Sequence, residues 1–251
     1  YLCLRRPVGE LARFIRIDSL GKERILHTPG YSEFYNLNST QGKLVWSERR
    51  YHPRWEHVKY NNIMVLDMSK KVMRAKQLTH RKRYYAPQLN YDATKIVCSE
   101  VTEDNQYALV ILDAKNGDIL HRFVFETFVM MPIWSPQGDE IYFMEMETNK
   151  GKKVSKIDIE SGQRQDITEA SFEFINRISF LGTDLIVQAG YNGVMNAYRV
   201  SSDGKLVQQI TNLPFGIEDI NQTQDGKLLY CNYTAKGYRI VKQFIQGNED
   251  N

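Results

Sequence analysis

Short apolar runs separated by polar turns recur along the whole chain. Each run follows a turn that is rich in Gly, Asp, Asn or Ser, and the copies start about 42 to 52 residues apart. Such runs of four to eight residues are typical of β-strands. No long stretch has the 3.6-residue periodicity of an amphipathic helix, so we expect helices to be scarce. The copies are LNSTQGKLVWSE (37–48), LNYDATKIVCSE (89–100), WSPQGDEIYFME (134–145), the degenerate SFLGTDLIVQAG (179–190), and NQTQDGKLLYCN (221–232).

The remainder of each repeat also follows one plan. A polar loop leads to a third strand that ends in a polar turn, as in ALVILDAKNGD, and a fourth strand closes the unit near a Thr, as in RQDITE. The turns KNGD, ESGQ and SDGK have the composition of hairpin connections between antiparallel strands. A period of about 40 to 50 residues made of strands is the signature of a propeller blade.

Counting strands in these units predicts an all-β, six-bladed β-propeller of four-stranded antiparallel blades, about 22 strands in all. The first and last blades supply only three strands each, and we expect their missing strands to lie in a longer parent protein. A five-bladed ring, in which these two partial sheets merge, is the alternative. The predicted single domain, 1–251, divides into a partial blade 1–28, blades 29–79, 80–125, 126–170 and 171–213, a partial blade 214–244, and a polar tail 245–251.

Composition narrows the possible functions. The 15 Tyr residues and the 12% aromatic content favour sheet. The net charge of +3 is small, so neither nucleic-acid binding nor adhesion to a membrane surface is indicated. No apolar run is long enough to cross a bilayer. The chain starts at a Tyr and shows no signal peptide, so we expect it to be processed or cut from something longer.

The stretch WSPQGDEIYF, with KQLTH and RQDITE closing neighbouring blades, resembles the TolB-like propeller repeat, a WD40-like (PD40) repeat. The same repeat builds the N-terminal propeller of dipeptidyl-peptidase-type enzymes. The stretch LVWSERRYHPRWEHVKYNNIMVLD is also similar to propeller regions of Bacteroidetes cell-envelope proteins. These resemblances imply a periplasmic or cell-surface location. In two copies the Trp-Ser-Pro is replaced, by Leu89-Asn90-Tyr91 and by Ile220-Asn221-Gln222.

The sequence contains no recognisable catalytic constellation. The Gly-x-Ser-x-Gly elbow of serine hydrolases is absent, as are His-Glu-x-x-His and phosphate-binding Gly-rich loops. His52 and His57 are close in sequence, but zinc needs further ligands. Six-bladed lactonases hold calcium on channel carboxylates, for which only Glu218 and Asp219 form a cluster. We therefore expect no enzyme activity, no metal and no cofactor in this chain.

The connections between an outer strand and the next inner strand are unusually aromatic for loops. Some of these rings are expected to fill gaps between blades. The others form an aromatic, partly basic mouth suited to a peptide or protein segment, with Arg83 pairing a carboxylate beside Tyr84. The candidate residues are Tyr31, Phe34, Arg83, Tyr84, Tyr85, Phe128, Met130, Phe172, Phe174 and Phe215.

A longer insertion, 47–62, carries Arg54 and Trp55 among other basic and aromatic residues. Such interleaving can stack bases or sugars, but a protruding hairpin that packs on its own blade or contacts another domain is the preferred interpretation. We predict a non-catalytic module for protein or peptide recognition or scaffolding within a larger extracytoplasmic protein. Its partners are a peptide or protein segment and other domains of the parent chain, without nucleic acid or membrane insertion. The alternative is the substrate-gating propeller of a peptidase whose catalytic domain lies outside this chain.

Overall fold

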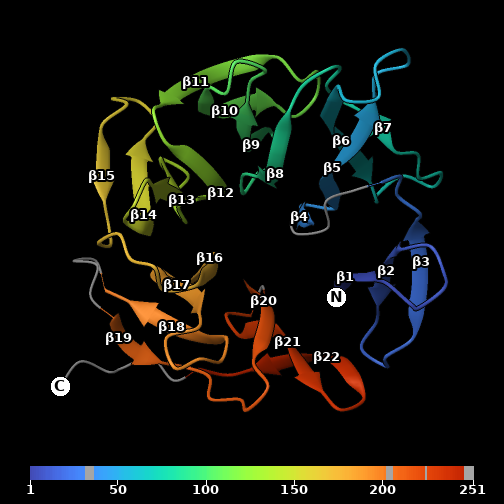
Figure 1. Ribbon diagram of the computed structural model, residues 1–251. Helices are drawn as coiled ribbons and strands as arrows, with labels where there is room; N and C mark the ends of the chain where they lie inside the picture. Colours follow the sequence, from blue (N-terminus) through green and yellow to red (C-terminus); the bar gives the residue numbers. More distant parts are fainter. Residues whose placement is uncertain (32–36, 202–205, 224, 246–251) are drawn as a thin grey trace. The chain divides into compact units, whose positions relative to one another are not determined.

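The computed structural model describes residues 1–31, 37–201, 206–223 and 225–245. Within these residues it contains 22 β-strands in six antiparallel sheets and no helix (Figure 1). Strands that follow one another in the sequence lie next to one another in each sheet. The chain divides into two compact units, Tyr1–Trp134 and Ser135–Asn251. This boundary falls after the first strand of the fourth sheet.

The first unit contains twelve strands within its described part. They are β1 (Leu2–Arg5), β2 (Arg13–Ile17), β3 (Glu23–His27), β4 (Asn38–Thr40), β5 (Lys43–Tyr51), β6 (Lys59–Asp67), β7 (Lys76–Gln77), β8 (Tyr84–Leu89), β9 (Lys95–Val101), β10 (Tyr107–Asp113), β11 (Ile119–Phe125) and β12 (Phe128–Trp134).

The second unit contains the remaining ten strands of the described chain. They are β13 (Glu140–Glu147), β14 (Gly151–Asp158), β15 (Arg164–Asp166), β16 (Ile175–Leu181), β17 (Asp184–Ala189), β18 (Asn196–Val200), β19 (Leu206–Gln209), β20 (Ile217–Gln222), β21 (Leu228–Thr234) and β22 (Gly237–Gln243).

The predicted fold class is confirmed. The six predicted groups of strands are the six sheets, and the first and last of them, β1–β3 and β20–β22, have three strands in the described residues. The alternative of five blades is wrong. Because each apolar run can bury its alternate side chains only against a neighbouring sheet, the repeat of about 45 residues produces a series of similar sheets.

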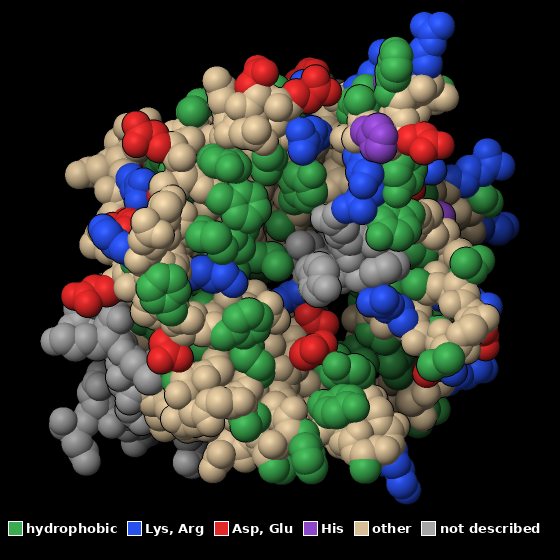
Figure 2. Space-filling view, viewed as in Figure 1, with side chains coloured by type: hydrophobic (Ala, Val, Ile, Leu, Met, Phe, Trp, Pro, Cys, Tyr) green, Lys and Arg blue, Asp and Glu red, His purple; other side chains and the backbone are tan. Residues whose placement is uncertain are grey.

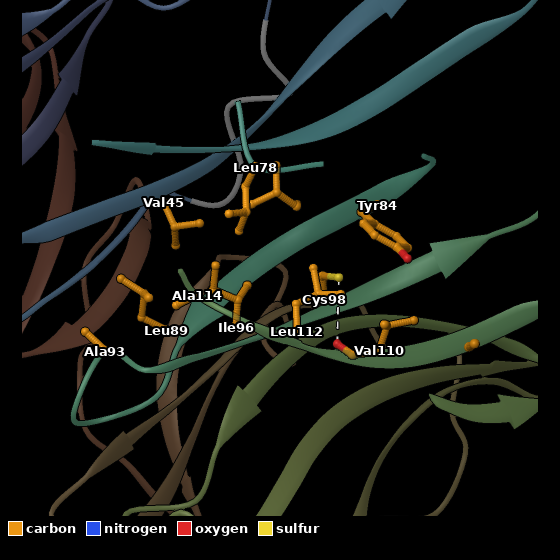
Figure 3. Packing of buried hydrophobic residues seen from close by; sticks show 12 residues of the cluster. Val45, Leu78, Tyr84, Leu89, Ala93, Ile96, Cys98, Val110, Leu112 and Ala114 are labelled. Carbon is orange, nitrogen blue, oxygen red and sulfur yellow. Dashed lines mark hydrogen bonds between the residues drawn. The ribbon is translucent and has the colours of Figure 1, made fainter. Parts of the chain in front are cut away.

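A continuous hydrophobic core in the first unit joins sheet β4–β7 to sheet β8–β11 (Figure 3). Val45 and Leu78 face Ile96 and other apolar side chains of β8, β9 and β10. The Tyr84 ring lies in the same cluster with none of its surface exposed. A separate core of Leu181, Ile186, Ala197, Ile217, Ile220, Leu228 and Tyr230 fills the second unit between β16–β18 and β20–β21.

The Ser-Pro-Gln-Gly turn before β13 forms as its sequence predicts. The Ser135 hydroxyl accepts hydrogen bonds from the backbone N–H groups of Gly138 and Glu140, both at 3.1 Å. It also donates to the Asp139 carboxylate at 2.8 Å. Gly138 adopts a φ of 80°, a left-handed conformation that favours glycine. This segment is therefore a structural connection between the first two strands of its blade.

Trp134 ends β12, and its indole N–H donates to the backbone oxygen of Gln88 in β8 at 3.0 Å. Its ring is half-buried. We expect Trp134→Phe, which removes the donor and keeps an aromatic ring, to lower the free energy of unfolding by about 1 kcal/mol. Urea unfolding measures the change, with the exposed Trp55→Phe as the matched control. Equal stability of the two variants would contradict a role for this hydrogen bond.

Candidate binding cleft

A cleft of about 250 Å³ lies in the first unit, where the β5–β6 hairpin meets the start of β8. In Figure 2, Lys, Arg and His side chains gather beside hydrophobic ones over the region where Figure 1 places these strands. Its lining is more basic than acidic, with a single carboxylate. The lining residues are Arg49, His57, Val58, Lys59, Asn61, Arg83, Tyr85 and Glu103.

The insertion 47–62 is an ordered hairpin that builds one side of this cleft. β5 and β6 pair without interruption from Lys43↔Asp67 to Tyr51↔Lys59. At the tip, the His52 backbone N–H donates to the carbonyl of Val58 at 2.9 Å. The His52 ring nitrogen Nδ1 accepts from the backbone N–H groups that follow it, at 3.1 and 3.2 Å. The tip therefore holds the exposed Trp55 on a defined turn.

The hairpin is fastened to the segment that leads into β8. The Asn61 N–H donates to the carbonyl of Lys82 at 2.7 Å, and Asn62 Oδ1 accepts from the Lys82 N–H at 3.2 Å. Asn61 and Arg83 form an isolated parallel bridge. The Arg83 guanidinium donates to the Thr102 carbonyl at 3.2 Å. These bonds fix two walls of the cleft relative to each other.

The electrostatics of the cleft favour a negative ligand. Arg49, Lys59 and Arg83 bring three permanent positive charges, whereas Glu103 is the one carboxylate among the lining residues. The Arg49 guanidinium carbon lies 5.1 Å from the centre of the Tyr31 ring, a cation–π distance. Oppositely charged ligands are concentrated in such a cleft because its low-dielectric walls focus the field.

The structure brings several predicted binding residues together here. Arg83 and Tyr85 line the cleft, Tyr31 contacts its Arg49, and Arg54 and Trp55 are exposed at the hairpin tip. The mouth and the insertion, treated as separate features in the sequence, are thus parts of one surface in this unit.

Five polar lining residues were not among the sequence candidates, although a signal for most of them exists. Lys59 and Asn61 are two residues apart in β6, and alternate residues of a strand share one face. Arg49 is the direct cross-strand partner of Asn61. Working out the strand pairing within the hairpin expected for the insertion would have placed Arg49, Lys59 and Asn61 together, while Glu103, from the β9–β10 connection, has no such signal.

Other candidates are placed differently from the prediction. Tyr84 was expected in an exposed loop, and this is wrong, because β8 begins there and the ring is buried in the core. Phe128 and Met130 also belong to a strand, β12, rather than to a loop. Both are half-buried, and the Phe128 ring meets that of Tyr107 edge-on, 5.5 Å between centroids. Phe34 lies outside the described residues.

The second unit holds the remaining three candidates. Phe172, Phe174 and Phe215 lie in connections between sheets and expose more than half of their surface. The Lys152 ammonium lies 5.0 Å from the centre of the Phe174 ring. The role of these exposed rings in partner binding stays a prediction.

The two carboxylates considered for calcium binding have other partners. Tyr238 donates to Glu218 at 3.2 Å, and Arg177 pairs with Asp219 at 2.9 Å. In the described part of the chain, no three His, Cys, Asp or Glu side chains come together as a set of metal ligands. Among the same residues there is also no helical segment with the length and hydropathy needed to span a bilayer.

No protein-family model matches the sequence, and no curated protein sequence matches it. Solved structures do match. The likeness to a putative TolB from Agrobacterium tumefaciens has a TM-score of 0.67 at 16% identity and covers 87% of this chain and 79% of that one. The β-propeller domain of the Trilobed protease from Pyrococcus furiosus gives 0.61 at 12% identity, over 97% and 90%. The fold is that of a TolB-like, six-bladed β-propeller.

Other propeller-containing structures cover the chain but extend beyond it. TolB from Acinetobacter baumannii matches with a TM-score of 0.60 at 14% identity, over 96% of this chain. A puromycin-hydrolyzing peptidase of Mycobacterium tuberculosis matches with 0.57 at 16% identity, over 88% of this chain. The chain spans 65% of the former and 40% of the latter. At these identities the likeness establishes the fold of the propeller module and does not establish an activity.

Proposed function

We propose that this propeller module recognises a peptide or protein segment and does no chemistry itself. The observation that carries the proposal is the cleft in which a basic set, Arg49, Lys59 and Arg83, lies together with the aromatic Tyr85. Tyr31 stacks on Arg49, and Trp55 is exposed at the tip of the hairpin that forms one wall. Aromatic and Arg side chains supply most of the energy at protein-binding surfaces.

The dimensions of the cleft suit a chain segment better than a drug-sized molecule. Small-molecule sites usually enclose about 300 to 1,000 Å³, and this cleft, at about 250 Å³, lies below that range. The exposed Trp55 projects from the adjoining hairpin tip. A bound segment would insert one group into the cleft and lie against the hairpin.

Selection from a pool of short synthetic peptides with free carboxyl ends tests the proposal. We expect the protein to enrich a family of sequences, and the double variant Trp55→Ala, Tyr85→Ala to lose at least tenfold in affinity for them, about 1.4 kcal/mol. Tyr91→Ala, an exposed aromatic of the same unit that does not line the cleft, is the control and should keep full affinity. No enrichment, or equal binding by the double variant, would refute the proposal.

A second candidate is favoured by the likeness to propellers of peptidases. In that case the module would gate access to a catalytic domain of the same parent protein. The full natural protein decides between the two, because an attached α/β-hydrolase region with a Gly-x-Ser-x-Gly elbow would support gating. An extracytoplasmic location also belongs to the proposal. The resemblance to TolB-like propellers supports it, and cell fractionation with an antibody against this module tests it.

A further inference from the structure

The polar groups that line the cleft are mainly hydrogen-bond donors. Guanidinium and ammonium groups have no acceptor atom, so Arg49, Lys59 and Arg83 can only donate. The His57 ring and the Tyr85 hydroxyl can also donate, which leaves Glu103 as the acceptor-only side chain of the lining. A ligand group that satisfies these residues must therefore carry oxygen acceptors.

A further donor at the cleft, the side-chain amide of Asn61, is buried without a partner in the described part of the chain. Asn61 is 3% exposed, and its side-chain nitrogen Nδ2 makes no hydrogen bond to a described residue. Its neighbour Asn62 is equally buried, but its side-chain oxygen accepts from Lys82. Leaving a buried donor unsatisfied costs about 1–3 kcal/mol, so an orphan of this kind requires an explanation.

The surroundings of Asn61 point to a ligand as that explanation. Its backbone is held by the carbonyl of Lys82, and it lies directly across the strand pair from Arg49. Asn61 is also one of the residues that line the cleft, together with two further cations. The amide is thus fixed among positive charges with its donor capacity unused.

The size of the cleft and the charges of its lining narrow the class of ligand group that it can bind. The cleft volume of about 250 Å³ has room for one end group and the atoms next to it. A phosphate dianion would be repelled by Glu103. A carboxylate is smaller, carries one negative charge, and leaves Glu103 to accept an adjoining amide N–H.

We propose that the cleft binds a carboxylate of the recognised segment, either a peptide C-terminus or an acidic side chain, with Asn61 Nδ2 as a donor and Arg49, Lys59 and Arg83 as counter-charges. This rests on the proposed function and names the group that the module reads. The two sources share one chemistry, and paired probes separate them.

Titration followed by NMR or calorimetry with small probes tests the inference. N-acetylphenylalanine and its amide differ only at the terminal carboxylate, and N-acetylglutamic acid α-amide carries only the side-chain carboxylate. We expect at least one of the acids to bind ten times or more tightly than N-acetylphenylalanine amide, and the tighter acid identifies the source. Equal binding of acid and amide, or tighter binding of phenyl phosphate than of either acid, would overturn the proposal.

Variants of the two neighbouring asparagines make the test specific. Asn61→Leu should lose at least tenfold in affinity for the acid probe while its unfolding midpoint stays equal or rises, because the orphan donor disappears. Asn62→Leu should lower the unfolding midpoint, since the N–H of Lys82 loses its acceptor. Arg74→Gln, an exposed cation of the same unit, should change neither quantity.

Asn61→Asp provides a second measurement in case the Leu variant does not fold. It has the same size, its charge is compensated by the nearby cations, and it should exclude the carboxylate probe. Undiminished acid binding in Asn61→Leu or Asn61→Asp would refute the assignment of the donor. If peptides are enriched through the cleft regardless of any carboxylate, only this inference fails. If the acid binds through Asn61 but no peptide is enriched, only the proposed function fails.

Discussion

Tyr84→Ala is expected to lower the free energy of unfolding by about 3–5 kcal/mol. The ring is fully buried between two sheets of the first unit and contacts the cluster that contains Cys98 and Leu78. Truncating a large buried aromatic side chain removes its transfer energy and leaves a cavity. Chemical denaturation of the folded protein measures the loss.

Tyr84→Phe is the matched control for the ring. The Tyr84 hydroxyl is buried and has no hydrogen-bond partner among the described residues, and burial raises the pKa of this phenol well above its usual range. Deleting an unsatisfied polar atom is close to neutral or stabilising. We therefore expect Tyr84→Phe to be at least as stable as the wild type, and a loss above about 1 kcal/mol would show that the hydroxyl is satisfied in solution.

Lys153→Ala is expected to lower the free energy of unfolding by about 3 kcal/mol. The Lys153 side chain is 5% exposed, on β14 of the second unit, and its ammonium lies 2.7 Å from Asp166. It also forms an ion pair with Glu147 and lies 3.8 Å from Glu145, which is 1% exposed. Removing one partner of a buried ion pair costs about 3–5 kcal/mol, and Arg164, which remains bonded to Glu145, keeps the cost at the lower end.

The adjacent lysine is the control for this prediction. Lys152 donates to the carbonyl of Ile175 at 3.0 Å and is half-buried, and no carboxylate pairs with it among the described contacts. Lys152→Ala should therefore cost less than the change at Lys153. If the two substitutions lower the free energy of unfolding equally, the ion pairs with the carboxylates are not the reason for the effect at Lys153.

The carboxylates that surround Lys153 also predict how the free energy of unfolding changes at acid pH. Hydrogen bonds from Lys153 and Lys150 lower the pKa of Glu147. Burial works to raise the pKa of Asp166, but hydrogen bonds from Lys153 and Ser155 outweigh it and the pKa is lowered. A carboxyl group whose pKa is lowered in the folded protein stabilises the fold at pH values above its unfolded pKa, which is about 4. This stabilisation is lost as the pH falls through the folded-state pKa.

Stability of the wild type should accordingly fall more steeply below about pH 4 than that of Lys153→Ala, in which both carboxyl groups lose this partner. Denaturant midpoints measured between pH 2 and pH 6 in steps check the difference. Parallel curves for the two proteins would show that Lys153 does not perturb these groups.

Much of the architecture was predictable because strand alternation and turn chemistry are local. The position of the Ser135 turn and all six groups of strands follow from residues within about ten positions of each other in the sequence. The three-stranded first and last sheets were predictable for the same reason, since each strand carries its own apolar run and turn.

The candidate site was only partly predictable because its walls come from separate elements. The aromatic character of the connections pointed to Arg83, Tyr85 and Tyr31. Whether a ring is exposed or packed depends on where the strand begins. Tyr84 is buried because β8 begins at this residue. Element boundaries of one or two residues are not encoded in composition.

The sequence by itself determined the all-β class, the series of blades, and the basic and aromatic character of the 47–62 insertion, because each depends on local periodicity. Only the tertiary structure decided that the hairpin expected for this insertion is joined to the segment that leads into β8, and that Arg49, Asn61 and Arg83 line one cleft. It also buried Asn61 Nδ2 with no hydrogen-bond partner among the described residues. Burial and hydrogen-bond satisfaction depend on neighbours from several strands, which no local pattern specifies.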